Sequence, residues 1–230
     1  MNRPRRMLRL ALVTILVAST GAITALTIPA GYAIAAGLAW SGCTSWGDAP
    51  SAHGWRYDDV IITTRDGLEL PGWFIYAEGV PAQVTVIAIP GHSSSHDTIL
   101  ADASIFIANG YSVLTVAHRR CVDPSYPDTL GYREWTDIAD QAAYLQQRGD
   151  TGHIAVFGFS AGGSTAIYAG ANEPAIEAVI AMGQMYDLRY SLLALDRKQP
   201  LPERAVRQIA HYYYRQMTGV RPRDISPAQM

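Results

Sequence analysis

The residues with the types and spacing best suited to chemistry are Gly158-Phe159-Ser160-Ala161-Gly162. A short apolar run at 154–157 precedes them, and small residues in a helix-like pattern follow. A strand, G-x-S-x-G and a helix in this order are typical of a nucleophile elbow, a strained turn that holds a serine hydroxyl above a sheet edge. We therefore predict Ser160 as a nucleophile. Gly158 and Gly162 are expected because side chains there would collide with the neighbouring strand and helix.

The residue after the serine extends this prediction. Ala161 would open the helix that follows the turn, so its backbone amide has no partner within that helix. Such an amide can donate a hydrogen bond to an oxyanion that develops when the serine attacks a carbonyl group. We therefore expect the Ala161 amide to contribute to an oxyanion hole.

The elements that must position this turn alternate along the chain. A hairpin is predicted at 57–64 and 68–76, around the turn signal Arg65-Asp66-Gly67. The remaining predicted strands and helices are the strands 84–89, 112–117, 154–157 and 176–182, and the helices 99–109, 133–148 and the one after Ser160. This alternation predicts an α/β fold with a mostly parallel sheet and helices on both faces.

The N-terminal part of the chain predicts a membrane anchor. Four arginines stand in the first nine residues, and the run from Leu10 to Gly42 has no charged residue. The stretch 10–28 is long enough to cross a bilayer as a helix, and longer than the apolar core of a cleaved signal peptide. The arginines should stay in the cytoplasm, which places the following domain outside.

These patterns divide the chain into four parts. We expect a basic cytoplasmic tail at 1–9, a membrane anchor at 10–40, a linker at 41–56 and a globular domain at 57–230 that includes a lid region at 187–224. Cys43 and Cys121 would share a compartment that permits a disulfide, although their spacing does not show that they pair.

Composition and spacing argue against several functions. The formal net charge of −2 argues against nucleic acid as a partner. No group of His, Cys or Asp residues has metal-ligand spacing, so no metal is expected. Gly162-Gly163 belongs to the predicted elbow rather than to a phosphate-binding loop, so no cofactor is expected.

Several short motifs along the chain form a set that points to one family. They are Arg65-Asp66-Gly67, Gly72-Trp73, Pro90-Gly91-His92, Gly131 with Trp135–Asp137, Gly152-His153-Ile154, Gly158–Gly163 and Asp224–Pro227. On these residues the chain resembles the α/β-hydrolase superfamily, in particular its serine-aminopeptidase and prolyl-oligopeptidase-like branch with an N-terminal membrane helix. It departs from that branch at Pro90-Gly91, where His-Gly is usual, and at 117–120, where Asp-x-Arg-Gly is common.

This resemblance implies a membrane-anchored serine hydrolase. Ser160 would attack a small-molecule ester or amide and form an acyl-enzyme, while the backbone amides of His92 and Ala161 hold the oxyanion. The family's acid and histidine follow later strands, so a chain that ends at Met230 resembles a C-terminally truncated hydrolase. A catalytically inactive hydrolase-like domain is therefore an alternative. Asp187 and His211 follow Ser160 in the order of a triad and form a rival pair, although 204–214 has the pattern of a lid helix.

Overall fold

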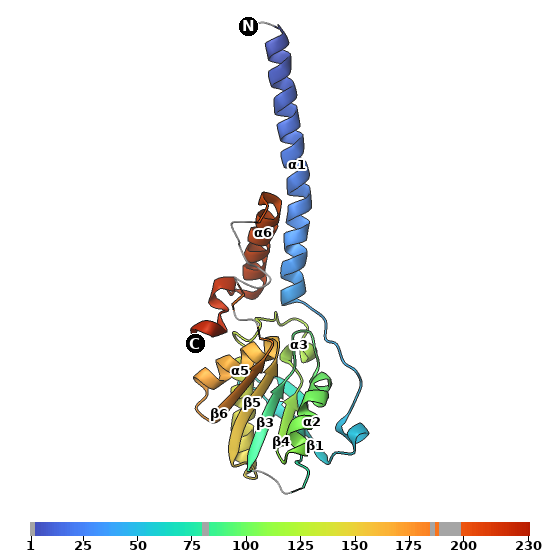
Figure 1. Cartoon of the computed structure of the whole chain (residues 1–230), viewed down its shortest axis with the longest axis vertical. Coiled ribbons are helices and arrows are strands. Elements are labelled where there is room, and N and C mark those ends of the chain that lie inside the picture. The colour runs from blue at the N-terminus through green and yellow to red at the C-terminus, as the bar shows by residue number, and fades with distance from the viewer. Residues whose placement is uncertain (1–2, 80–82, 185–186, 189–198) are drawn as a thin grey trace.

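One long helix stands on a compact α/β domain in the computed structural model, which describes residues 3–79, 83–184, 187–188 and 199–230 (Figure 1). In chain order, the strands are β1 Tyr57–Thr63, β2 Glu69–Ile75, β3 Val84–Ile89, β4 Ser112–Val116, β5 His153–Phe159 and β6 Ile176–Met182. The α-helices are α1 Arg3–Ala39, α2 Leu100–Ala108, α3 Arg119–Val122, α4 Trp135–Arg148, α5 Ala161–Asn172 and α6 Leu201–Thr218. Short 3-10 turns stand at Pro50–His53, His96–Ile99, Pro222–Asp224 and Pro227–Gln229.

Within the described residues the sheet has six strands in the order β1-β2-β4-β3-β5-β6. The predicted hairpin pairs β1 with β2, and β2 continues antiparallel onto β4. The strands β4, β3, β5 and β6 then run parallel to one another. The α/β fold expected from the alternating pattern is therefore confirmed, with an antiparallel pair at one edge of an otherwise parallel sheet.

Helices cover both faces of this sheet. On one face, Ala103 and Ile107 of α2 pack against Val86, Val113 and Phe157. On the other face, α4 and α5 bury a second apolar layer, which includes Ile138, Leu145, Ala166, Ala169, Ile87 and Val156. Strand β6 is the outer strand on the side of β5, and its Val179, Ile180 and Met182 side chains are each more than two-fifths exposed.

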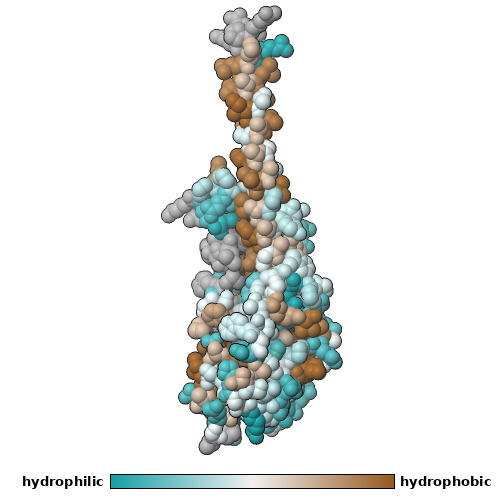
Figure 2. Space-filling view, turned by 90° about the vertical axis from the view of Figure 1, so that its right-hand side faces the viewer, coloured by the Kyte–Doolittle hydropathy of each residue, from teal (hydrophilic) through white to brown (hydrophobic). Residues whose placement is uncertain are grey.

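Helix α1 continues beyond the run of 10–28 that suffices to cross a bilayer. Pro29 lies inside it, and the helix ends only at Ala39. The part from Arg6 to Ala39 is long and apolar enough to span a membrane, by length and composition alone. Figure 2 shows many hydrophobic side chains on the visible face of the free half of this helix, away from the domain.

The second half of α1 packs along α6, as Figure 1 shows. Gly31 allows a close approach, because a Cβ at this position would lie 2.6 Å from a side-chain carbon of Ile209. The rings of Tyr32 and Tyr213 meet edge to face at 5.2 Å between centroids. These contacts explain why the helix persists past Pro29: its last turns are held by tertiary packing rather than by local propensity.

Candidate active site

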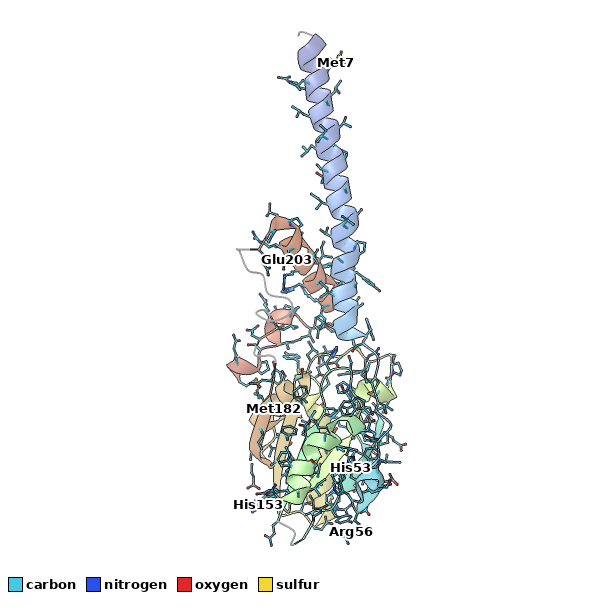
Figure 3. All side chains as sticks on the ribbon, turned by 45° about the vertical axis from the view of Figure 1, so that its right-hand side comes forward. Met7, His53, Arg56, His153, Met182 and Glu203 are labelled. Atoms are coloured by element: carbon cyan, nitrogen blue, oxygen red, sulfur yellow. A yellow bond between two sulfur atoms is a disulfide. The ribbon has the colours of Figure 1, made fainter. Side chains whose placement is uncertain are left out.

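Ser160 lies between the end of β5 and the start of α5. Its backbone has φ 55° and ψ −118°, a conformation that costs energy for a residue with a side chain. The Ser160 amide donates to the Met182 carbonyl at 2.8 Å, and its own carbonyl accepts from the amides of Gly163 and Ser164 at 3.0 and 3.2 Å. These bonds hold the turn in its strained form. Figure 3 labels Met182, which marks the level of Ser160 on the sheet, and His153, which marks the opposite end.

Two glycines surround the turn for a steric reason. A Cβ on Gly158 would overlap the carbonyl oxygen of Gly162. A Cβ on Gly162 would overlap the carbonyl oxygen of Pro90, at the end of the neighbouring strand. Both contacts are with backbone atoms that cannot turn away, so neither position has room for a side chain. The turn therefore has the geometry of a nucleophile elbow.

The loop after β3 lies directly against this elbow. A Cβ built on Gly91 would lie 3.6 Å from the Cβ of Ser160. The next amide along this loop is that of His92, and the next amide after the serine is that of Ala161. Neither amide has a hydrogen-bond acceptor in the part of the chain that the structure describes. Two unpaired amides beside a serine are the donors that an oxyanion hole requires.

The Ser160 hydroxyl itself has no hydrogen-bond partner among the described residues, and its side chain is partly exposed. Within the described residues, no hydrogen bond joins Asp187 or His211, the rival pair, to Ser160. Asp187 is buried and accepts a hydrogen bond from Ser226 Oγ at 3.0 Å. His211 lines a surface hollow together with Arg215 and Arg221, on a different side of α6 from the one that meets α1.

A largely buried polar cluster that the sequence did not predict lies next to His92, in the loop after β3. His118, Asp128 and Glu134 place one potential ligand atom each within 4.8 Å of one another. The residues come from two loops and a helix start, and their spacing follows no metal motif, so the sequence held no signal for the cluster. Both Glu134 carboxylate oxygens already accept hydrogen bonds, from the amides of Thr129 and Gly131 and from the Thr129 hydroxyl, at 2.7–2.8 Å.

This cluster shapes the loop that supports the elbow helix. Burial and the nearby charge of Asp128 raise the pKa of Glu134 above its usual range. Glu134 holds the loop that contains Gly131, where a Cβ would lie 2.6 Å from the Thr165 amide of α5. The cluster therefore has a clear structural task, because both Glu134 oxygens accept hydrogen bonds from the loop at 129–131.

The two cysteines form a disulfide that spans 78 residues of sequence. Cys43 lies just after α1 and Cys121 lies on α3, so the bond ties the predicted linker to the rim of the site. The sequence left this pairing open because the two residues are far apart along the chain.

Comparison with known proteins identifies the fold. No protein-family model matches the chain, and no curated protein matches it significantly. Among solved structures, the Pyrococcus furiosus esterase Pf2001 in one crystal form is 20% identical over 77% of this chain and 69% of its own, with a TM-score of 0.59. In another crystal form the values are 24%, 63% and 58%, with a TM-score of 0.54. The alpha/beta hydrolase GrgF from Penicillium sp. is 25% identical over 58% of this chain and 48% of its own, with a TM-score of 0.50.

Proposed function

With the α/β-hydrolase fold as the premise, we propose that this chain is a serine hydrolase that acts on ester or amide bonds through an acyl-enzyme on Ser160. The observation that carries the proposal is the strained turn at Ser160 with two unpaired amides, those of Ala161 and His92, beside it. The chain spans only 58% of the esterase matched in the P21 crystal form, so the activity of that protein is an analogy here. The finer placement in the serine-aminopeptidase and prolyl-oligopeptidase-like branch rests on the sequence motifs.

The proposed reaction follows from these groups. Ser160 Oγ attacks the carbonyl carbon of the substrate, its proton passes to a base, and the carbonyl oxygen becomes an oxyanion that accepts from the amides of Ala161 and His92. Collapse of this intermediate expels the alcohol or amine, which takes up the proton that Ser160 gave to the base, and leaves an ester on Ser160. Water then attacks that ester and releases the acid.

A second candidate function has its own supporting observation. In the described parts of the chain, no histidine or carboxylate is hydrogen-bonded to the Ser160 hydroxyl. A serine without a base is a weak nucleophile. A hydrolase-like domain that binds a carbonyl ligand without turning it over would have this arrangement.

Hydrolysis of p-nitrophenyl butyrate by the full chain in detergent separates the two. We expect turnover above the buffer rate, and a loss of several orders of magnitude in Ser160→Ala, because the nucleophile is removed. An equal rate in both proteins would overturn the Ser160 assignment. No turnover in the unchanged protein would favour the non-catalytic domain.

We further propose that α1 anchors the domain to a membrane, with the domain on the extracytoplasmic side. Support comes from the apolar surface of α1, the arginines at its start and the disulfide, which is typical of oxidising compartments (Figure 2). We expect the full chain to stay in the membrane fraction after washing with alkaline carbonate. Release into the soluble fraction by that wash would contradict the anchor.

A further inference from the structure

The segment that follows α1 crosses the rim of the candidate site and bonds to the loop after β3. The Thr44 amide donates to the Ser93 carbonyl at 2.6 Å, and the Ser95 amide donates to the Thr44 carbonyl at 2.7 Å. Together the two bonds form a short parallel bridge between the segment and the loop. We call residues 41–47 the juxtamembrane clamp.

The clamp is fastened at both of its ends. Next to Thr44, Cys43 is bonded covalently to Cys121. Beyond Thr44, one carboxylate oxygen of buried Asp97 accepts from the Ser45 hydroxyl at 2.7 Å and from the next two amides, those of residues 46 and 47, at 2.6 and 2.8 Å. The clamp is therefore a fixed part of the domain surface.

The clamp holds a strained residue. Ser93 has φ 63°, a conformation that a residue with a side chain adopts only where its surroundings enforce it. The Thr44 backbone bonds to the Ser93 carbonyl and to the Ser95 amide. It therefore holds the loop at and just after the strained residue. His92 immediately precedes this residue, and it follows Gly91, which lies against Ser160.

The His92 side chain is held by the same part of the chain. Its Nε2 lies 2.9 Å from the Leu38 carbonyl and 3.0 Å from Ser41 Oγ, and its Nδ1 lies 3.1 Å from Ser93 Oγ. With the ring and the following residue both fixed, the direction of the His92 N–H is fixed as well.

We propose that the juxtamembrane clamp positions the His92 amide as an oxyanion donor, so that the segment joining the anchor to the domain belongs to the catalytic apparatus. Thr44 is the central positioning residue, and it acts through its backbone. This inference rests on the proposed hydrolase function. It implies that a soluble form made by removing residues 1–45 would keep the elbow and lose the alignment of one donor.

Two substitutions at Thr44 form a matched pair. Thr44→Pro removes the N–H that donates to Ser93, whereas Thr44→Ala removes only the side chain and keeps both backbone bonds. Removal of a single oxyanion donor costs about 100- to 1,000-fold in kcat. Thr44→Pro misaligns the donor without removing it, so in the full chain in detergent we expect kcat for p-nitrophenyl butyrate to fall about tenfold or more, with KM little changed. Thr44→Ala keeps both backbone bonds, so it should lower kcat far less than Thr44→Pro does.

Rescue distinguishes positioning from general damage. Glycine adopts positive φ freely, so Ser93→Gly added to Thr44→Pro should recover part of the lost kcat. If Thr44→Pro does not fold, Asp97→Ala releases the other end of the clamp and should lower kcat in the same direction. Unchanged kcat in Thr44→Pro, or an equal loss in Thr44→Ala, would overturn the proposal.

Hydrogen exchange of the peptide 90–97 separates this inference from the proposed function. We expect faster exchange in Thr44→Pro than in Thr44→Ala, whether or not the protein turns over an ester. Faster exchange without any turnover in the unchanged protein would refute the hydrolase and support the clamp as the element that holds the loop. Equal exchange in the two variants would refute the clamp.

Discussion

Breaking the disulfide should cost a large share of the stability of the domain. Cys43 and Cys121 close a loop with a sequence separation of 78 residues. Because the bond restricts the unfolded chain, a loop of this size corresponds to about 4.5 kcal/mol in the chain-entropy account. For a domain of about 200 residues, each kcal/mol shifts the unfolding midpoint by about 2–4 °C, so the expected loss is roughly 9–18 °C.

The assay compares thermal unfolding of the unchanged protein and of the double variant Cys43→Ala/Cys121→Ala, each with and without a thiol-free reductant. We expect the reductant to lower the midpoint of the unchanged protein to that of the double variant, and to leave the double variant unaffected. A shift of less than about 2 °C would show that the bond does not constrain the unfolded chain in this way, and would refute the reasoning.

Two further predictions concern residues around the same site. Gly162→Ala should destabilise the domain by about 1–3 kcal/mol or more, because its Cβ would overlap the Pro90 carbonyl oxygen. Gly91→Ala should be close to neutral, because its Cβ would make ordinary contacts of 3.5–3.6 Å with Phe159 and Ser160. Equal thermal unfolding midpoints for the two variants would contradict this account of the turn. Burial opposes ionisation of Asp97, but the hydrogen bonds that its carboxylate accepts outweigh burial and lower its pKa below the usual value for aspartate. The ionised carboxylate therefore adds stability above that usual pKa, and this stability is lost as the pH falls through the folded pKa. Asp97→Asn should therefore be less stable than the unchanged protein at neutral pH, with a gap that narrows in acid, and a gap that stays constant with pH would count against it.

Local patterns were enough to predict much of the fold. The alternating runs gave the hairpin, the buried strands and the helices on both faces, because periodicity and turn residues act over a few neighbouring positions. The strand, tight turn and helix around Ser160 could be predicted for the same reason, because Gly158, Ser160 and Gly162 lie within five residues of one another.

The features that the sequence did not reveal depend on contacts between distant segments. Thr44 meets Ser93, and Cys43 meets Cys121, only because the chain returns to the same rim after several elements. Similarly, α1 continues past Pro29 because α6, from the other end of the chain, packs against it. Residue type and spacing do not predict such long-range contacts, since loops of many lengths could bring the same residues together.

Labelling by a fluorophosphonate, followed by peptide mapping, tests the central claim most directly. The reagent forms a covalent bond with a serine only where that serine is nucleophilic and the phosphoryl oxygen is stabilised. The account predicts one adduct per chain, on the peptide that contains Ser160, and no adduct in Ser160→Ala. An adduct on another residue, or equal labelling of the Ser160→Ala variant, would contradict it.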